Sequence, residues 1–168
     1  MDIISMFPIG HGRFGLKNKY SLKDRIYIGN TTMDPELAFI QANCAAVRPC
    51  DIVLDPFCGT GGLLLPCGEF GAFVIGCEIN YGIAKGVGRS SRAGVEMRSA
   101  EESVVANFRQ YGTEGRFLSL IIADSSRHDM WRRGATFDAI VADRRCAVVD
   151  EPRWKDIVRR RTYLLITE

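Results

Sequence analysis

The chain has 168 residues, of which 46% are hydrophobic and 25% are charged, and its formal net charge is +2. This length and composition suit one globular domain, or a large part of one, and exclude disorder as the main state. The apolar runs are far shorter than the roughly 20 residues of a membrane span, and residues 1–10 lack the features of a signal peptide. We therefore expect a cytoplasmic protein with no membrane partner.

The basic residues and the cysteines do not indicate a function by themselves. Arginines cluster at residues 132–133, 144–145 and 159–161, where they either bind phosphates or form a solvated face. None of the six cysteines has C-x-x-C spacing. We expect reduced thiols that pack as small core residues, and no metal site.

The first elements follow local signals in the chain. Residues 1–24 predict an irregular N-terminal segment, and residues 26–28 form a short β-type run. A helix start is expected at residues 31–36, because Thr or Asp can cap a helix and Pro suits its first turn. This helix should end before Pro49. Its expected apolar face consists of Leu37, Ile40, Ala42, Cys44 and Val47.

From residue 51 the pattern alternates between strands and helices. Apolar runs predict strands at 52–54, 72–77, 117–123 and 137–142, and helices at 63–70 and 100–111, with a loop or broken helix at 80–100. Such alternation predicts an α/β fold with a parallel sheet and right-handed crossovers. Ligands bind at the carboxyl ends of strands in such sheets. The four predicted strands end in acidic residues that we expect to ring one crevice, namely Asp55, Glu78, Asp124 and Asp143.

The loop at residues 55–62 reads Asp-Pro-Phe-Cys-Gly-Thr-Gly-Gly and lies between a strand and a helix. It lacks the lysine of a phosphate-binding loop, and Leu64 replaces the third glycine of a dinucleotide-binding loop. The remaining pattern, Asp-x-Phe-x-Gly-x-Gly, is the first motif of class I methyltransferases, whose glycines let the backbone approach the methionine part of the cofactor. Glu78 would then accept hydrogen bonds from the ribose hydroxyls. Asp124, with Ser125 beside it, would accept from the adenine amino group.

Several segments together resemble the eukaryotic tRNA guanosine-10 N2-methyltransferase family. They are residues 28–34 (IGNTTMD), 55–64 (DPFCGTGGLL), 70–72, 106–112, 123–126, 131–134 and 137–143. The resemblance implies a Rossmann-like class I methyltransferase domain with S-adenosyl-L-methionine as cofactor. It also implies tRNA as substrate and a small zinc-binding methyltransferase activator subunit as partner. Asp143 matches the first residue of the family's catalytic motif. The implied cofactor-binding residues are Thr32, Asp55, Phe57, Gly59, Gly61, Glu78, Asp124 and Ser125.

The resemblance ends after Asp143. The family continues with Pro-Pro-Tyr, whereas this chain continues with Arg144, Arg145 and Cys146. In the family, the acid and a prolyl carbonyl accept the hydrogens of the guanine amine, and the aromatic ring stacks on the extruded base. Positioning of this kind supplies roughly 7–11 kcal/mol of a barrier. We therefore expect weak or absent methyl transfer by this chain.

These observations divide the chain into an irregular N-terminal segment (1–24), a cofactor-binding domain (25–143) and a divergent C-terminal tail (144–168). We expect incomplete C-terminal strands, with one further strand at 163–166, because of an altered reading frame, alternative splicing or a fragment. Two functions stay open: an impaired tRNA methyltransferase, and a non-catalytic S-adenosylmethionine- or RNA-binding module. Leu64 disfavours a nicotinamide-dependent oxidoreductase.

Overall fold

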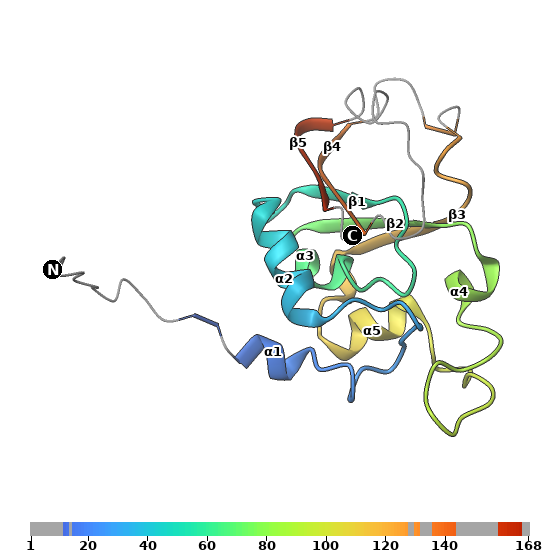
Figure 1. The fold of residues 1–168 in the computed structure, drawn as a ribbon. Coiled ribbons are helices and arrows are strands. Elements are labelled where there is room, and N and C mark those ends of the chain that lie inside the picture. The colour runs from blue at the N-terminus through green and yellow to red at the C-terminus, as the bar shows by residue number, and fades with distance from the viewer. Residues whose placement is uncertain (1–11, 14, 128–129, 132–135, 144–157, 166–168) are drawn as a thin grey trace, which may run out of the picture.

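A parallel sheet with helices packed on it forms the fold. The computed structural model describes residues 12–13, 15–127, 130–131, 136–143 and 158–165 (Figure 1). The sheet order is β3-β2-β1-β4-β5, and every neighbouring pair of strands is parallel. The strands are β1 (Ile52–Asp55), β2 (Phe73–Glu78), β3 (Phe117–Ile122), β4 (Phe137–Asp143) and β5 (Val158–Leu165).

This architecture confirms the predicted α/β class and parallel sheet. The first four strands begin and end within one residue of their predicted limits, because each is a short apolar run bounded by polar or turn residues. The fifth begins at Val158, five residues before the predicted strand at 163–166.

The helices depart from the prediction near the N-terminus. They are α1 (Gly15–Lys19), α2 (Pro35–Cys44), α3 (Leu64–Glu69), α4 (Tyr81–Lys85), α5 (Val104–Gln110) and the 3-10 turn η1 (Glu114–Arg116). The prediction that residues 1–24 are irregular is therefore wrong for α1, and Tyr20 just after it is fully buried. The strand expected at residues 26–28 is absent too. The backbone of Tyr27 bonds to the side chain of Asn107 instead of to a neighbouring strand.

Helix α2 begins as predicted, but only part of its expected apolar face is buried, since Ala42 is buried and Cys44 is exposed. The Asp34 carboxylate accepts hydrogen bonds from two backbone N–H groups of the first turn, and Pro35 opens the helix. Leu37 and Ile40, however, are 47% and 51% exposed. The buried side consists of Pro35, Ala38, Gln41 and Ala42. Small side chains on that side let the helix approach the core closely, which the apolar pattern alone did not indicate.

Alternate residues of each central strand pack into two different clusters. Val53 belongs to the main cluster, which also contains residues of α2, α3 and α5, whereas Leu54 belongs to a smaller cluster. The same alternation separates Val141 from Ile140. Successive side chains of a strand point to opposite faces of the sheet, so the main cluster lies under the helices and the smaller one on the other face. Figure 1 shows α2, α3 and α5 gathered on one side.

The chain reverses its course across the sheet at β1. It runs outward through β2 to β3 and then returns to place β4 on the other side of β1. The carboxyl ends of β1 and β4 therefore flank the topological switch point, which is where ligands bind in sheets of this kind. None of the helices in the described part of the chain combines the length and apolar character that a membrane span requires.

Candidate functional site

A cavity of about 480 Å³ opens at the carboxyl ends of β1 and β4. Its walls come from residues 29–33, the loop between β1 and α3, the segment at residues 86–102, Ile83 and Asp143. Pockets for small molecules and cofactors usually measure about 300–1,000 Å³. The cavity at the switch point is therefore of a suitable size for one such ligand.

Two of the strand-end acids, Asp55 and Asp143, line this cavity. Asp55 is 1% exposed, and its carboxylate accepts a hydrogen bond from the Phe57 backbone N–H at 3.0 Å. Burial raises the pKa of Asp55 to about 8, and the charges of Glu78 and Asp143 act in the same direction. Asp55 is therefore mostly protonated at neutral pH, and a cation inside the cavity would favour its ionised form.

Glu78 at the end of β2 binds the glycine-rich loop. Its Oε2 accepts from the Gly59 backbone N–H at 3.0 Å, and its Oε1 accepts from the Asn80 N–H at 2.8 Å. A carboxylate has about four acceptor sites, so each oxygen keeps capacity for a further donor. Glu78 therefore positions Gly59, which lines the cavity, while retaining the ability to bind hydroxyl groups.

The glycines of the loop have two different surroundings. Gly59 has a φ of +53°, and a Cβ built there would meet no atom within 4 Å. Gly61 has a φ of +82°, and a Cβ there would lie 2.9 Å from Val104 Cγ1. Both glycines adopt a positive φ, a backbone conformation that is unfavourable for residues with a Cβ. Gly59 leaves space in the cavity, whereas Gly61 permits close packing of the loop on α5.

The segment before α2 closes one side of the cavity. Residues 29–33 line it, and the Thr32 hydroxyl accepts from the Gly29 N–H at 2.7 Å. Thr32 Oγ1 also lies 3.0 Å from Thr60 Oγ1, within hydrogen-bonding distance. Thr32 and Phe57, which the sequence predicts as cofactor-binding residues, both line this cavity.

Asp124 and Ser125 do not line the cavity. Asp124 Oδ1 accepts from the backbone N–H and the hydroxyl of Ser126, and these bonds lower the pKa of Asp124. The Ser125 hydroxyl donates to the Pro56 carbonyl at 2.5 Å and so connects the end of β3 to the glycine-rich loop. The four acids therefore do not ring one crevice as expected. Asp55 and Asp143 line the cavity, Glu78 binds the glycine-rich loop, and Asp124 lies in a neighbouring turn.

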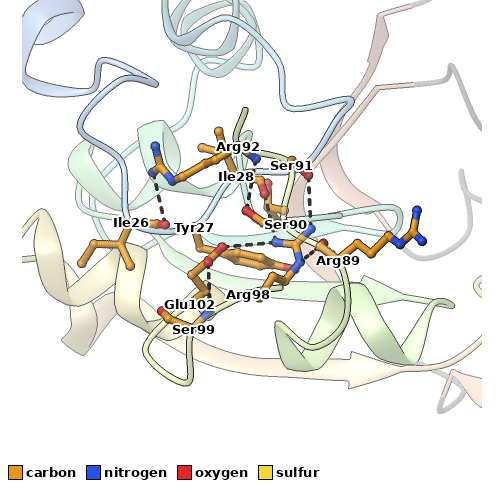
Figure 2. Close-up of polar contacts among 12 residues, drawn as sticks. Ile26, Tyr27, Ile28, Arg89, Ser90, Ser91, Arg92, Arg98, Ser99 and Glu102 are labelled. Carbon is orange, nitrogen blue, oxygen red and sulfur yellow. Dashed lines mark hydrogen bonds and ion pairs between the residues drawn. The ribbon is translucent and has the colours of Figure 1, made fainter. Parts of the chain in front are cut away.

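Sequence reasoning missed the wall formed by the segment at residues 86–102. Arg89, Ser90, Ser91 and Arg98 line the cavity, although this stretch was predicted only as a loop or broken helix (Figure 2). The available signal was the density of arginine and serine within ten residues. The denser arginine clusters at residues 132–133, 144–145 and 159–161 lie outside the described residues or side chains.

The cysteines and possible metal ligands of the described residues suggest no further chemistry. Cys58, Cys67 and Cys77 are buried, whereas Cys44 and Cys50 are exposed. Burial raises the pKa of the Cys58 thiol well above its usual range, which disfavours the reactive thiolate. Within the described ranges, no three or more His, Cys, Asp or Glu side chains are placed to hold a metal ion.

Comparison with known proteins identifies similar domains. Residues 23–116 match the family described as RMKL-like, methyltransferase domain. The tRNA (guanine(10)-N(2))-methyltransferase TRMT11 of Xenopus laevis is 47% identical over 135 residues, which are 80% of this chain and 28% of that relative. The protein of the same name from Dictyostelium discoideum is 38% identical over 126 residues, which are 74% of this chain and 22% of that relative.

These relatives confirm the resemblance expected from the sequence, and the chain spans less than a third of their length. A solved structure of an S-adenosylmethionine-dependent O-methyltransferase from Thermotoga maritima aligns with a TM-score of 0.48 and 19% identity. That alignment covers 73% of this chain and 37% of the other.

Proposed function

The chain belongs to the family of RMKL-like methyltransferase domains, and we propose that its cavity binds S-adenosyl-L-methionine for methylation of a guanosine N2 amine in tRNA. The observation that carries the proposal is the meeting of three features at the switch point. The open side of Gly59, the Glu78 carboxylate behind it and the acids Asp55 and Asp143 all lie at one cavity or against its wall.

The residues at the cavity fit this cofactor. S-adenosylmethionine carries a positively charged sulfonium that supplies an electrophilic methyl group. Asp55 offers a buried carboxyl to that charge, and Gly59 leaves space for the amino-acid part. Glu78 retains acceptor capacity for the ribose hydroxyls. The residues we propose for cofactor binding are Thr32, Asp55, Phe57, Gly59, Gly61, Glu78, Asp124 and Ser125. Gly61 and Ser125 act by holding the loop, and Asp124, which does not line the cavity, would accept from the adenine amino group.

Asp143 is the proposed catalytic residue. It ends β4 and lines the cavity, where its carboxylate would accept a hydrogen bond from the guanine amine and so orient the nitrogen lone pair. We propose guanine-10 of tRNA as the methylated base because the similar proteins are named for that reaction. We extend the proposal to a small zinc-binding activator subunit as partner and to action in the cytoplasm.

The replacement of Pro-Pro-Tyr by Arg144, Arg145 and Cys146 favours a second candidate function. Without the rigid prolines and the stacking ring, the acid alone positions the amine poorly. We propose that methyl transfer by this chain is weak or absent. In that case the chain acts as a non-catalytic module that binds S-adenosylmethionine or RNA.

Calorimetric titration with S-adenosylmethionine tests the cofactor site. Wild-type chain should bind, and Glu78→Gln should bind at least about tenfold more weakly, because charge-assisted hydrogen bonds contribute about 1.5–3 kcal/mol. Glu114→Gln is the matched control, since Glu114 lies in η1 at the amino end of β3 and pairs with Arg109 at the surface. Absence of heat with wild-type chain at millimolar cofactor would refute the proposal.

Transfer of a labelled methyl group to unmodified tRNA separates the two functions. Wild-type chain should show little transfer. The triple variant Arg144→Pro, Arg145→Pro, Cys146→Tyr should show more, because it restores the family's motif. Rapid transfer by wild-type chain would disprove the impairment. Cofactor binding without transfer by either chain would favour the non-catalytic module.

A further inference from the structure

The segment at residues 86–102 is fixed to the rest of the domain by a buried arginine. The Arg98 guanidinium donates to the carbonyls of Arg89 at 2.9 Å and Ile28 at 3.0 Å, and lies 4.6 Å from the centre of the Tyr27 ring (Figure 2). It also pairs with Glu102 at 3.5 Å, and the two side chains are only 7% and 8% exposed. Arg98 therefore joins the segment to Ile28, directly before the wall at residues 29–33.

A second arginine anchors the same segment further out. Arg92 Nη2 donates to the carbonyls of Arg25 and Ile26, and Nη1 donates to the carbonyl of Lys23 at 3.5 Å. Two of the segment's three arginines are thus used to hold backbone.

Arg89 differs from both. It is exposed and lines the cavity, and in the part of the chain that the structure describes its guanidinium donates no hydrogen bond and joins no ion pair. Figure 2 shows its side chain extending away from the cluster around Arg98. Its backbone is nevertheless fixed, because its carbonyl accepts from Arg98 and it forms an antiparallel bridge with Met97.

A guanidinium that has no partner among the described residues, and whose backbone is fixed at a cavity, is suited to bind an anion. Within the proposed function, a base that reaches Asp143 must leave its stack, and its backbone phosphates then lie near the rim. Exposure of Arg89 favours a phosphate of the RNA over the carboxylate of an enclosed cofactor. We propose that Arg89 binds a backbone phosphate of the RNA substrate beside the extruded nucleotide; this inference rests on the proposed function.

The affinity of the chain for unmodified tRNA, measured over a range of salt concentrations without cofactor, tests this assignment. Arg89→Gln should weaken binding about three- to tenfold. It should also reduce the slope of log K against log salt by about 0.7–0.9, as expected for the loss of one phosphate contact. Arg89→Lys should retain the slope because it keeps the charge. The control Arg48→Gln removes an exposed arginine four residues before the amino end of β1, whereas the cavity lies at its carboxyl end, and should leave both quantities unchanged.

The affinity for S-adenosylmethionine distinguishes this inference from the proposed function. It should be equal in wild-type chain and Arg89→Gln. A loss of cofactor affinity in Arg89→Gln with unchanged tRNA affinity would assign Arg89 to the cofactor and overturn the inference. Equal losses of tRNA affinity in Arg89→Gln and Arg48→Gln, or no tRNA binding by wild-type chain, would also overturn it. Wild-type chain that binds tRNA but not the cofactor would refute the proposed function instead.

Discussion

Replacing Asn107 with alanine should destabilise the domain and loosen both walls of the cavity. Asn107 lies on α5 and is fully buried. Its Oδ1 accepts from the Tyr27 backbone N–H at 2.8 Å, and its Nδ2 donates to the Tyr27 carbonyl at 2.8 Å and the Thr60 carbonyl at 3.4 Å. One side chain thus connects the segment before α2 to the glycine-rich loop.

The size of the effect follows from the two short bonds. Alanine leaves the N–H and the carbonyl of Tyr27 without a partner in a region that solvent does not reach. Each unsatisfied buried group costs about 1–3 kcal/mol, so the free energy of unfolding should fall by about 2–6 kcal/mol. A domain of this kind has only about 5–15 kcal/mol in total. The melting temperature should therefore drop by at least about 4 °C.

Urea unfolding followed by circular dichroism measures this loss. The control is Asn43→Ala, which changes an exposed asparagine of α2. A loss of less than about 1 kcal/mol relative to that control would refute the reasoning, since one unsatisfied group alone accounts for that much.

The variant Asn107→Asp separates hydrogen bonding from packing. Its carboxyl keeps the shape, but burial raises its pKa, and only the protonated form can donate to the Tyr27 carbonyl. A folded-state pKa above the unfolded one means that stability is present at low pH and is lost as pH rises. A deficit independent of pH would show that packing, and not the hydrogen bonds, matters at this position.

Three further predictions concern the walls of the cavity. Because the pKa of Asp55 is raised from 3.8 to about 8, the folded state keeps a proton that the unfolded state releases. The free energy of unfolding should therefore fall between pH 4 and pH 8, and Asp55→Asn should remove that decline and gain up to about 4 kcal/mol at pH 7 in urea unfolding. Gly86→Ala should lower the melting temperature more than Gly59→Ala. A Cβ at Gly86 would clash with the Glu102 carbonyl oxygen, whereas a Cβ at Gly59 would meet nothing within 4 Å. A larger drop in Gly59→Ala would contradict this geometry. Arg98→Lys should lower stability by about 1–3 kcal/mol despite its charge, since an ammonium cannot reproduce the planar fork, and unchanged thermal unfolding would show that the fork is dispensable.

Local sequence patterns predicted most of the sheet. A run such as residues 52–54 forms a strand because its apolar side chains can be buried on both faces, and the pattern is complete within a few residues. The cap at Asp34 is also predictable from local sequence, because its carboxylate bonds only to backbone N–H groups of the next three residues.

Predictions failed where a distant residue supplied the partner. Residues 26–28 have the composition of a strand, but the backbone of Tyr27 bonds to Asn107, eighty residues away, and the Ile26 N–H donates to the Gln110 side chain. The apolar pattern predicts Leu37, Ile40 and Ala42 on the buried side of α2, but only Ala42 is buried there. Close approach of the helix to the core is made by the small side chains of Ala38 and Ala42.

The amino-acid sequence by itself determined the first four strands, the glycine-rich loop and the acidic residue at or within two residues of the end of each of these strands. Only the tertiary structure decided which of those acids share a cavity, because strand order depends on pairing between segments far apart in the chain. Asp55 and Asp143 meet because β4 returns to the side of β1, whereas Asp124 follows the edge strand β3 and serves its own turn. Long-range hydrogen bonds from Arg98 to Ile28 and from Arg92 to Ile26 likewise hold the segment with Arg89 at the cavity, where no local pattern had placed it.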